Sequence, residues 1–393
     1  MEQVQSDIVI SGAGLAGMLA AAAFANKGVD VVLVDPVEPV TDLKSKTADL
    51  RSTAFLTPAV DLISEIGLWD KLKSASCPLE VMRLADAGGE DNTLRHVADF
   101  VATEVKDGPF GWNVQNTAMR SVLLEHLQSL KNVQMGFGNK LELVANRSSE
   151  VIVRMGATQI RTKALIIAEG RNSATRDALG VKTKRWDYGQ SAMAFAISHE
   201  DPHENISTEI HRTGGPFTLV PMPTKGKKQF SSVVWMERQR AVDELLKLPQ
   251  KGFETALQER STGVLGKLKL ETEIQAFPII SQLVETLAVG RCCLIGESAH
   301  VVPPIGAQGL NMSLADIAWL YEHLTEVLDR SQAKAFEKAR LGDMKLRRKG
   351  IDALNRAAMT EMQPLRDLRL EGLKLLHGIK PVRHAVMRKG LGV

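Results

Sequence analysis

The chain begins with a pattern of apolar runs separated by a helical segment. Residues Ile8–Ile10 form an apolar run, an alanine-rich stretch with helical spacing follows to about Lys27, and Gly28 ends it before a second run, Val31–Val34. This order predicts a β-α-β unit. Because a crossover helix joins parallel strands, we expect an α/β sheet covered on both faces.

The same kind of pattern continues to about residue 180. Helical spacing predicts one helix over Pro58–Lys73 and another over Thr117–Leu130, and short strands are expected within Val133–Arg154. The wholly apolar run Ala164–Ala168 is typical of a central strand of the first sheet. Between the two helices, residues Leu79–Asp107 are mixed and polar. The segments on either side of that stretch therefore belong to one unit of sheet and helices.

Residues 181–285 differ in kind. Alternating apolar and polar positions predict strands such as Ala192–Ile197 and Phe230–Trp235. The region also contains prolines at positions 216, 221 and 223, which are typical of turns and strand edges. We interpret it as a β-rich second domain. The apolar run Cys292–Ile295 then returns to the first sheet, and helices are expected to the end of the chain.

Composition narrows the class of protein. The chain has 393 residues, of which 44% are hydrophobic and 24% charged, as in ordinary folded proteins of two or three domains. No apolar stretch approaches the ~18 residues of a membrane-spanning helix, and Met1–Asp7 is polar and acidic, unlike a secretory signal. We therefore predict a cytoplasmic protein. A net charge of +3, without basic tracts among aromatic residues, argues against nucleic acid as a partner.

The cysteines and histidines do not suggest a metal centre or disulfide bonds. Cys77 stands alone, and Cys292 and Cys293 are adjacent, without the spacing of a zinc site. We expect the three cysteines to be small buried residues, and no metal to bind. His211 and Arg212, in the β-rich region, are expected to be solvated.

Positive charge gathers at the C-terminal end. Residues Pro364–Val393 hold seven basic and two acidic side chains, a balance of +5. Apolar side chains lie among them: Leu368, Leu370, Leu373, Leu375, Leu376, Ile379, Val382, Val386 and Met387. Two interpretations stay open. The segment lies on an anionic membrane surface or docks a partner, or it packs on its own domain with its cations solvated.

A glycine motif lies between the first predicted strand and the first predicted helix. Its sequence is Gly12-Ala13-Gly14-Leu15-Ala16-Gly17. In such a motif the first glycine permits a tight turn, the second lets the main chain approach a pyrophosphate, and the third lets helix and strand pack closely. Asp35, at the end of the second strand, would accept hydrogen bonds from ribose hydroxyls. The motif indicates an adenine dinucleotide, but by itself it does not separate NAD from FAD.

A second group of residues follows the strand Cys292–Ile295. Its sequence is Gly296-Glu297-Ser298-Ala299-His300, then Pro303-Pro304-Ile305-Gly306-Ala307-Gln308-Gly309-Leu310-Asn311. A carboxylate, that of Glu297, leaves the end of a strand, and a loop of proline and glycine leads into a helix. The N–H groups of such a helix could meet the electron-rich edge of a flavin.

This group resembles the second fingerprint of flavin-dependent aromatic hydroxylases, which is usually written G-D, then A-A-H and P-x-x-G-Q-G-x-N. Residues Glu169-Gly170-Arg171-Asn172-Ser173-Ala174-Thr175-Arg176 resemble the third motif of that family, D-G-x-x-S-x-x-R. Arg51 resembles the arginine that the family places near the flavin phosphates, and Gln115 with Arg120 matches its Q-x-x-x-x-R segment. The resemblance covers nearly the whole chain.

Within the family, three segments are most similar to the ring hydroxylases of ubiquinone biosynthesis: Leu50–Ala54, Ile66–Trp69 and Gln308–Asn311. The resemblance implies an α/β fold with a Rossmann-like FAD-binding domain of the GR2, or para-hydroxybenzoate hydroxylase, type. It implies an inserted β-rich substrate domain and C-terminal helices. The expected ranges are 1–75, 108–180 and 286–335 for the FAD-binding domain, 76–107 and 181–285 for the substrate domain, and 336–393 for the C-terminal helices.

The resemblance also implies the cofactor and its site. FAD would bind without a covalent bond, and NADPH or NADH would be the co-substrate. The residues expected to hold FAD are Gly12, Gly14, Leu15, Ala16, Gly17, Asp35, Arg51, Gln115, Glu297, Gly309, Leu310 and Asn311. The third motif, with Glu169, Gly170 and Arg171, is expected to serve the nicotinamide side. No catalytic residue is assigned, because the flavin carries the chemistry.

Two glutamates depart from the family pattern. Glu169 stands where the family has the aspartate of its D-G motif, and Glu297 stands where it usually has the aspartate that binds the ribityl chain of the flavin. Each adds one methylene, so the reach of the carboxylate changes by roughly a bond length. Gly306-Ala307 also reverses the commoner Ala-Gly order. For His300, shaping of the loop by a hydrogen bond is favoured over a catalytic role.

The function implied is hydroxylation of the aromatic ring of a polyprenylated phenol in ubiquinone biosynthesis. NAD(P)H would reduce FAD, reduced FAD would capture O2 as a C4a-hydroperoxide, and the distal oxygen atom would be transferred to the ring. Expected partners are a small, prenylated aromatic substrate and O2, with contact to the inner face of the membrane or to a biosynthetic complex through the basic C-terminal segment. The alternatives are a hydroxylase or reductase of another aromatic or isoprenoid substrate, and a non-catalytic flavoprotein subunit.

Overall fold

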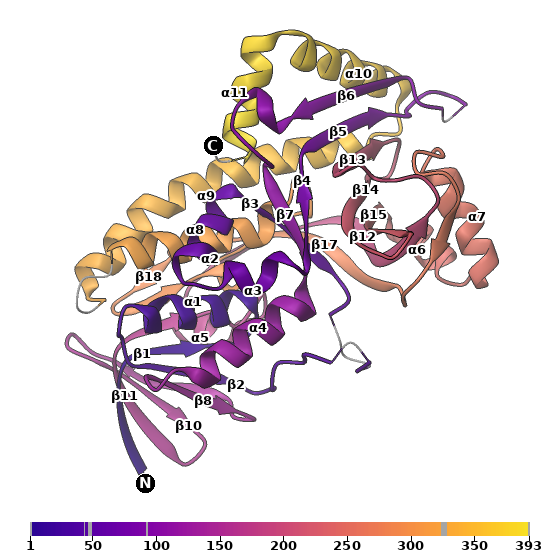
Figure 1. The fold of residues 1–393 in the computed structure, drawn as a ribbon. Coiled ribbons are helices and arrows are strands. Elements are labelled where there is room, and N and C mark those ends of the chain that lie inside the picture. The colour runs from indigo at the N-terminus through magenta and orange to yellow at the C-terminus, as the bar shows by residue number, and fades with distance from the viewer. Residues whose placement is uncertain (1, 43, 46–48, 92, 324–327, 392–393) are drawn as a thin grey trace.

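The computed structural model describes residues 2–42, 44–45, 49–91, 93–323 and 328–391. Residues 1, 43, 46–48, 92, 324–327 and 392–393, which fall within the expected domain ranges, lie outside the described residues. The described strands form three sheets, with helices around them (Figure 1). The α/β fold class predicted from the sequence is confirmed.

The first sheet has the strand order β18-β19-β11-β1-β2-β8, with β10 and β9 added beside β11. β1 pairs in parallel with β11 and with β2, as the β-α-β pattern predicts, and β19 pairs in parallel with β11. The apolar run near residue 165 is therefore a central strand. The strands are β1 (Glu2–Ser11), β2 (Val31–Asp35), β8 (Val133–Phe137), β9 (Leu141–Asn146), β10 (Val151–Met155), β11 (Thr158–Ile167), β18 (Ala288–Val289) and β19 (Cys292–Leu294).

The first helix is buried on nearly all sides. α1 (Leu15–Asn26) packs on the first sheet and contacts α4 (Asn116–Ser129) and α8 (Gln308–His323). A helix that is apolar all round belongs inside a core, so its alanine-rich sequence is explained. The single helix expected over Pro58–Lys73 is wrong, because α2 (Thr57–Glu65) ends before Gly67, whose φ is +75°, and α3 (Trp69–Lys73) begins after it.

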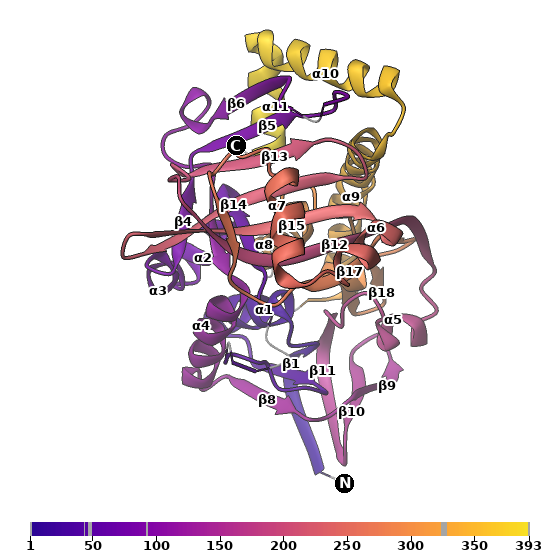
Figure 2. The ribbon, with the colours of Figure 1, turned by 90° about the vertical axis from the view of Figure 1, so that its right-hand side faces the viewer.

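The second sheet has the order β20-β17-β12-β15-β14-β13-β5-β6, and β16 pairs with β12. Its strands are β5 (Val81–Asp86), β6 (His96–Val101), β12 (Thr183–His199), β13 (Ile206–His211), β14 (Pro216–Lys225), β15 (Lys228–Arg238), β16 (Leu268–Leu270), β17 (Gln275–Val284) and β20 (His300–Val301). α6 (Gln239–Leu245) and α7 (Gln250–Arg260) lie in front of one face in Figure 2. Pro216, Pro221 and Pro223 all lie within β14, whose pairing with β15 shifts register between Met222 and Lys225.

A small third sheet lies against the second sheet. β3 (Ser52–Leu56) and β4 (Ser76–Leu79) both pair antiparallel with β7 (Gly111–Gln115). The buried amide of Asn113 on β7 donates a hydrogen bond of 2.8 Å to the carbonyl oxygen of Pro221 on β14. Ser52 on β3 shares a hydrogen bond of 2.7 Å with Ser232 on β15. β3 therefore runs across one face of the second sheet.

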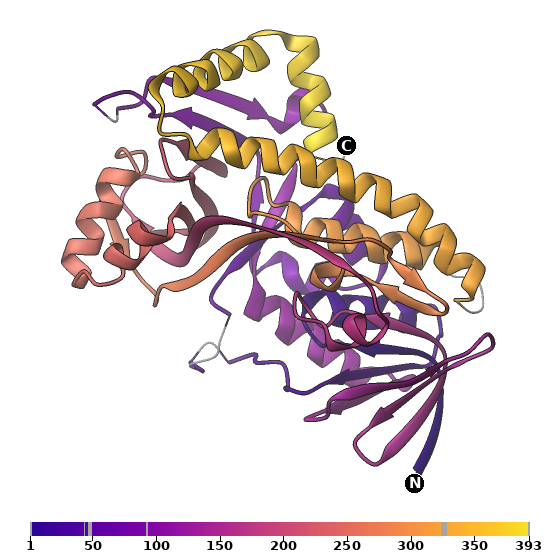
Figure 3. The same cartoon turned by 180° about the vertical axis from the view of Figure 1, so that it is seen from behind.

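The C-terminal helices cover the outer strands of the second sheet and the back of the molecule (Figure 3). The remaining helices are α5 (Ala174–Ala178), α9 (Arg330–Met359), α10 (Gln363–Gly378), α11 (Lys380–Leu391) and two 3-10 turns, Ala102–Glu104 and Gly296–Ser298. Phe100 of β6 meets His377 of α10 edge to face, and Met387 of α11 is buried beside it. The C-terminal segment thus packs one side on its own chain. The domain ranges stay a prediction, and α9 runs through the boundary drawn between residues 335 and 336.

The expectation that His211 and Arg212 are solvated is wrong. Their side chains are only 16% and 20% exposed. They lie at the end of β13, where Arg369 of α10 donates hydrogen bonds to the carbonyl oxygens of both residues. The sequence could not reveal this, because the covering helix lies more than 150 residues later in the chain.

Candidate functional site

The glycine turn between β1 and α1 is packed too closely for side chains. Gly12 has a φ of +108°, and a Cβ there would lie 2.3 Å from the carbonyl oxygen of Ala168. A Cβ on Gly17 would lie 1.8 Å from the carbonyl oxygen of Gly12. Gly14, where α1 begins, has open space at the corresponding position. Main-chain N–H groups at a helix start beside open space fit the pyrophosphate of FAD.

Asp35 lies beside this turn at the end of β2. Its Oδ2 accepts a hydrogen bond of 2.6 Å from the main-chain N–H of Ala13, and its Oδ1 accepts one of 2.8 Å from that of Val37. The carboxylate therefore holds the glycine turn against β2. It also stands where the sequence motif places the acceptor for a ribose.

Glu169 holds together the ends of two parallel strands. Its carboxylate accepts hydrogen bonds from the hydroxyl of Ser11 on β1 at 2.5 Å, from the hydroxyl of Ser173 at 2.7 Å, and from the N–H of Thr175 at 3.0 Å. The hydroxyl of Thr175 donates a further short bond. The longer glutamate side chain therefore spans the gap from β1 to the start of α5, and its role inside the protein is structural.

Glu297 and Arg171 form an ion pair between the second and third motifs. Nε and Nη2 of Arg171 each lie 3.1 Å from one carboxylate oxygen of Glu297. The contact is therefore two-pronged. The side chain of Arg171 is 29% exposed and that of Glu297 is 48% exposed, so the pair lies at the surface of the site. A ligand that needs the carboxylate must therefore compete with Arg171.

Arg51 belongs to a cluster of opposite charges beside the same site. Burial alone would raise the pKa of Asp49. The pKa is nevertheless lowered, because Arg51 provides a hydrogen bond and a positive charge, Asn116 donates a hydrogen bond, and Arg120 adds a second positive charge. The hydrogen bond with Asp49 raises the pKa of Arg51 more than burial lowers it, and the charge of Glu297 adds to the rise. Arg51 and Glu297, 246 positions apart in the sequence, thus act on one place.

Gln115 adjoins this cluster by strand pairing. It ends β7, lies opposite Ser52 of β3, and occupies the position before the first turn of α4. Asn116 next to it donates from its main chain to the carbonyl oxygen of Arg51 at 3.0 Å. The predicted Q-x-x-x-x-R segment is therefore brought to Arg51 by the third sheet.

The loop before α8 is fixed by Asn311. Its amide donates to the carbonyl oxygens of Ala54 at 2.8 Å and Ala307 at 2.6 Å, and its Oδ1 accepts from the N–H of Leu56 at 2.9 Å. All of these partners are main-chain groups. The side chain of Asn311 therefore forms hydrogen bonds with the backbone of β3, as the backbone of a paired strand does, and holds α8 beside it. The α8 residue Leu310 packs on the core, while Gly309 has open space where a side chain would be.

His300 takes part in a buried hydrogen-bonded network. Its Nε2 lies 2.8 Å from Oδ2 of Asp316, and the other oxygen of Asp316 accepts from Nε of Arg340 at 2.9 Å. His300 and Asp316 are 2% and 0% exposed. The favoured interpretation, a residue that shapes the loop through hydrogen bonding, is confirmed. Within the described ranges, no group of three or more His, Cys, Asp or Glu side chains could hold a metal ion.

Sequence analysis missed several residues that build this site. Asp49 was overlooked because an acidic residue two positions before Arg51 has no motif of its own. Thr175 and Ser173 lie inside the third motif, but only the structure shows that both serve Glu169. Asp316 could have been suspected, because a lone acid in an otherwise apolar turn of a helix needs a partner.

Comparisons with known proteins agree on one family. The family described as FAD binding domain matches residues 5–339. Ubiquinone hydroxylase UbiL of Rhodospirillum rubrum is 30% identical over 98% of this chain and 90% of its own length. The 3-demethoxyubiquinol 3-hydroxylase of Escherichia coli is 23% identical, with all of both chains covered.

Solved structures agree with the fold. The p-nitrophenol 4-monooxygenase PnpA of Pseudomonas putida has a TM-score of 0.76 at 18% identity, covering 100% of this chain and 99% of its own. PqsL of Pseudomonas aeruginosa, described as a probable FAD-dependent monooxygenase, has a TM-score of 0.75 at 16% identity, with coverages of 94% and 99%. At these identities the likeness concerns the fold.

The Gly306-Ala307 pair makes a testable prediction about the loop before α8. Both residues have left-handed backbones, with φ of +62° at Gly306 and +57° at Ala307. A side chain is disfavoured there, so Ala307→Gly should stabilise the protein by about 0.5–1 kcal/mol, after the entropy that glycine adds to the unfolded chain. Gly306→Ala should destabilise it by a similar amount. Free energies of unfolding from urea titrations measure both effects, and changes of the same sign in both variants would contradict this account.

Proposed function

The chain belongs to the FAD binding domain family, and from this premise we propose that it hydroxylates the aromatic ring of a polyprenylated phenol in ubiquinone biosynthesis. The reaction would use NAD(P)H and O2, placing one oxygen atom on the ring and releasing the other as water. The proposal is supported by two observations: the charge of Glu297 acts on Arg51, and Asn311 ties the start of α8 to β3 while α8 contacts α1, the helix that follows the glycine turn. Similarity to ubiquinone hydroxylases along the whole chain supports the class of substrate.

The residues around the site suit the parts of FAD. The N–H groups beyond Gly14 would bind the pyrophosphate, Asp35 the ribose of the adenosine half, and Arg51 a phosphate. Glu297 would bind hydroxyls of the ribityl chain after release from Arg171. When bound, the flavin takes two electrons from the nicotinamide and activates O2. The full set proposed to contact FAD is Gly12, Gly14, Leu15, Ala16, Gly17, Asp35, Arg51, Gln115, Glu297, Gly309, Leu310 and Asn311.

The protein itself would bind and orient the substrate and exclude water. Asn311 fixes β3 beside the start of α8, and Ser52 fixes β3 on the second sheet. The loop before α8 (residues 303–307), which we call the flavin loop, and the second sheet are thereby both held to β3 by hydrogen bonds. A rigid site of this kind holds a ring at a constant distance from the cofactor. For the third motif, we propose that Gly170 and Arg171 lie on the nicotinamide side, while Glu169 supports them from within.

We also propose that the basic C-terminal region lies on an anionic membrane surface in the cytoplasm. Residues 330–393 hold sixteen basic and six acidic side chains, a balance of +10, so the rest of the chain carries −7 within the total of +3. No described helix is long and apolar enough to cross a membrane. A cationic surface attracts anionic lipid headgroups at about 1 kcal/mol per lysine or arginine near the membrane.

Exposed side chains on α9, α10 and α11 support this contact. Lys334, Lys338, Lys345 and Lys349 share one face of α9, and all four are exposed. Large apolar side chains are also exposed on these helices and beside them: Leu346, Leu354, Met362, Leu365, Leu368, Leu375, Ile379, Val382 and Val386. Cations beside exposed apolar residues are the composition of a surface that lies in a lipid interface. At that interface the protein would meet a prenylated substrate held in the membrane.

The proposed reaction is tested with purified protein, FAD, NADPH or NADH, and 2-prenylphenol under isotope-labelled O2. We expect each hydroxylated product to carry one labelled oxygen and the nicotinamide consumed to match the product formed. Reduction of the flavin without labelled product would favour a reductase. No reduction by either nicotinamide, with FAD bound, would favour a non-catalytic subunit. Either result overturns the proposal.

The membrane contact is tested by sedimentation with vesicles of phosphatidylcholine alone or mixed with phosphatidylglycerol. The wild type should bind only the anionic vesicles, and less at high salt, because exposed charges are screened. Lys345→Glu with Lys349→Glu should weaken binding about tenfold or more. The control is Lys251→Glu with Lys267→Glu, two exposed lysines at the far end of the second sheet. Equal loss in both pairs, or binding to neutral vesicles alone, would contradict a specific surface.

A further inference from the structure

The two faces of the second sheet are filled differently. The face under α6 and α7 is packed with large apolar side chains, among them Phe195, Phe217 and Trp235, each no more than 4% exposed. The opposite face, which we call the inner face, looks toward β3, the flavin loop and the C-terminal helices. There the same three strands place alanine, threonine and valine at the neighbouring positions. The inner face therefore leaves room that the outer face does not.

Strand pairing defines one row of side chains across the inner face. Ala194 of β12 lies opposite Val234 of β15, which lies opposite Thr218 of β14, which lies opposite Glu209 of β13. We call these four residues the inner row. Val234 and Thr218 are only half-buried although they belong to central strands. Val234 also packs with the cluster that holds Ile305, but part of Val234 and of Thr218 stays exposed, and a ligand could contact these two side chains.

The rows on either side of the inner row are covered. On one side Ser232 is bonded to Ser52 of β3, and Val220 packs with Ala54 and Leu56. On the other side Ala192 and Met236 pack with Ile305 of the flavin loop. The inner row thus lies between β3 and the flavin loop, the two elements that Asn311 ties together. A ring bound next to a flavin at the start of α8 would rest on the inner row.

Glu209 is the one ionisable side chain of the inner row, and its partners are few. It is 4% exposed, and among the described residues its carboxylate meets only His211, whose Nε2 lies 2.8 Å from Oε1. Nδ1 of His211 is buried and has no hydrogen-bond partner within the described part of the chain. A buried carboxylate with one partner is costly for stability. Packing alone therefore does not explain a glutamate at this position.

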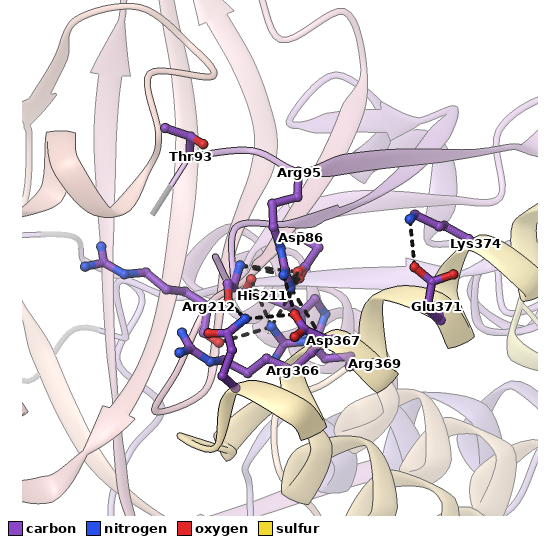
Figure 4. A network of polar contacts seen from close by, with 12 residues as sticks. Asp86, Thr93, Arg95, His211, Arg212, Arg366, Asp367, Arg369, Glu371 and Lys374 are labelled. Atoms are coloured by element: carbon purple, nitrogen blue, oxygen red, sulfur yellow. Dashed lines mark hydrogen bonds and ion pairs between the residues drawn. The ribbon is translucent and has the colours of Figure 1, made fainter. Parts of the chain in front are cut away.

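The end of β13 is held rigidly by a polar network, drawn in Figure 4. Asp86 of β5 accepts hydrogen bonds from Arg95 at 2.9 Å and from Arg369 at 3.3 Å, and Arg95 also pairs with Asp367 of α10. Arg369 donates to the carbonyl oxygen of His211 at 3.4 Å. Helix α10 thereby fixes the strand that carries Glu209. A carboxylate on a fixed strand can select the position of a hydroxyl group.

We infer that Glu209 contacts the substrate and accepts a hydrogen bond from the phenolic hydroxyl, and that His211 is a positioning residue that orients its carboxylate. This inference rests on the proposed function and adds how the ring is recognised. A carboxylate acceptor draws the hydroxyl proton toward itself, which makes the ring richer in electrons at the carbon to be hydroxylated. A site that pairs with a hydroxyl also rejects an analogue without that hydrogen.

The experiment compares 2-prenylphenol with its methyl ether, which lacks the hydroxyl hydrogen, on the FAD-loaded protein. Dissociation constants come from the change in the visible absorption of the bound flavin. The wild type should prefer the phenol by about tenfold or more, and Glu209→Leu should abolish that preference. Glu259→Leu, the same change at an exposed carboxylate of α7, should keep it. His211→Gln should retain more of the preference than His211→Leu.

A second measurement separates recognition from folding. Because removing only one partner of a buried pair leaves the other unpaired, the double variant Glu209→Leu with His211→Leu should leave the midpoint of thermal unfolding unchanged or higher. A large fall in that midpoint would mean a structural role and overturn the inference. If Glu209→Leu yields no folded protein, Thr218→Leu tests the same row, since filling it should block the phenol.

The outcomes also separate this inference from the proposed function. If the wild type hydroxylates the phenol, and Glu209→Leu keeps both the preference and the share of nicotinamide that ends in product, only the role of Glu209 fails. If the wild type forms no hydroxylated product, the proposed function fails. We expect Glu209→Leu to consume nicotinamide largely without product, because the ring is no longer held in place.

Discussion

The structure depends on the close approach of two main chains at the carboxyl ends of β1 and β11. No side chain fits at Gly12 or Gly17, because the carbonyl oxygens of Ala168 and of Gly12 occupy the space that a Cβ would need. This contact sets the start of α1 against the end of the central strand. Every other part of the candidate site is placed relative to that start, since the parallel strands β2 and β19 end at the same edge of the sheet.

Polar side chains then join segments that are far apart in the sequence. Glu169 joins β1 to the start of α5, Asn311 joins α8 to β3, and Glu297 meets Arg171. The two glutamates that depart from the family pattern thus have different roles. Glu169 makes its contacts inside the fold, whereas Glu297 forms a partly exposed ion pair with Arg171. We propose that the departure at residue 297 is the one that concerns the affinity for FAD.

Much of the fold could be predicted from the sequence, because local patterns determine it. The apolar runs at residues 8–10 and 164–168 identified neighbouring parallel strands, and the glycine motif identified the turn. The break at Gly67 was missed because the apolar spacing continues through it. The covering of His211 by α10 and the position of Glu209 in the inner row depend on strand register and on helices late in the chain. Neither leaves a local signal, so side-chain roles at the site were harder to predict than its elements.

The central claim is that these dispersed segments form one site for a non-covalent FAD. Its most direct test is titration of the flavin-free protein with FAD, followed by visible absorption and by the flavin released on denaturation. We expect binding to saturate at one FAD per chain, and all of the flavin to be released unmodified when the protein unfolds. A protein that remains free of flavin at saturating FAD would contradict it.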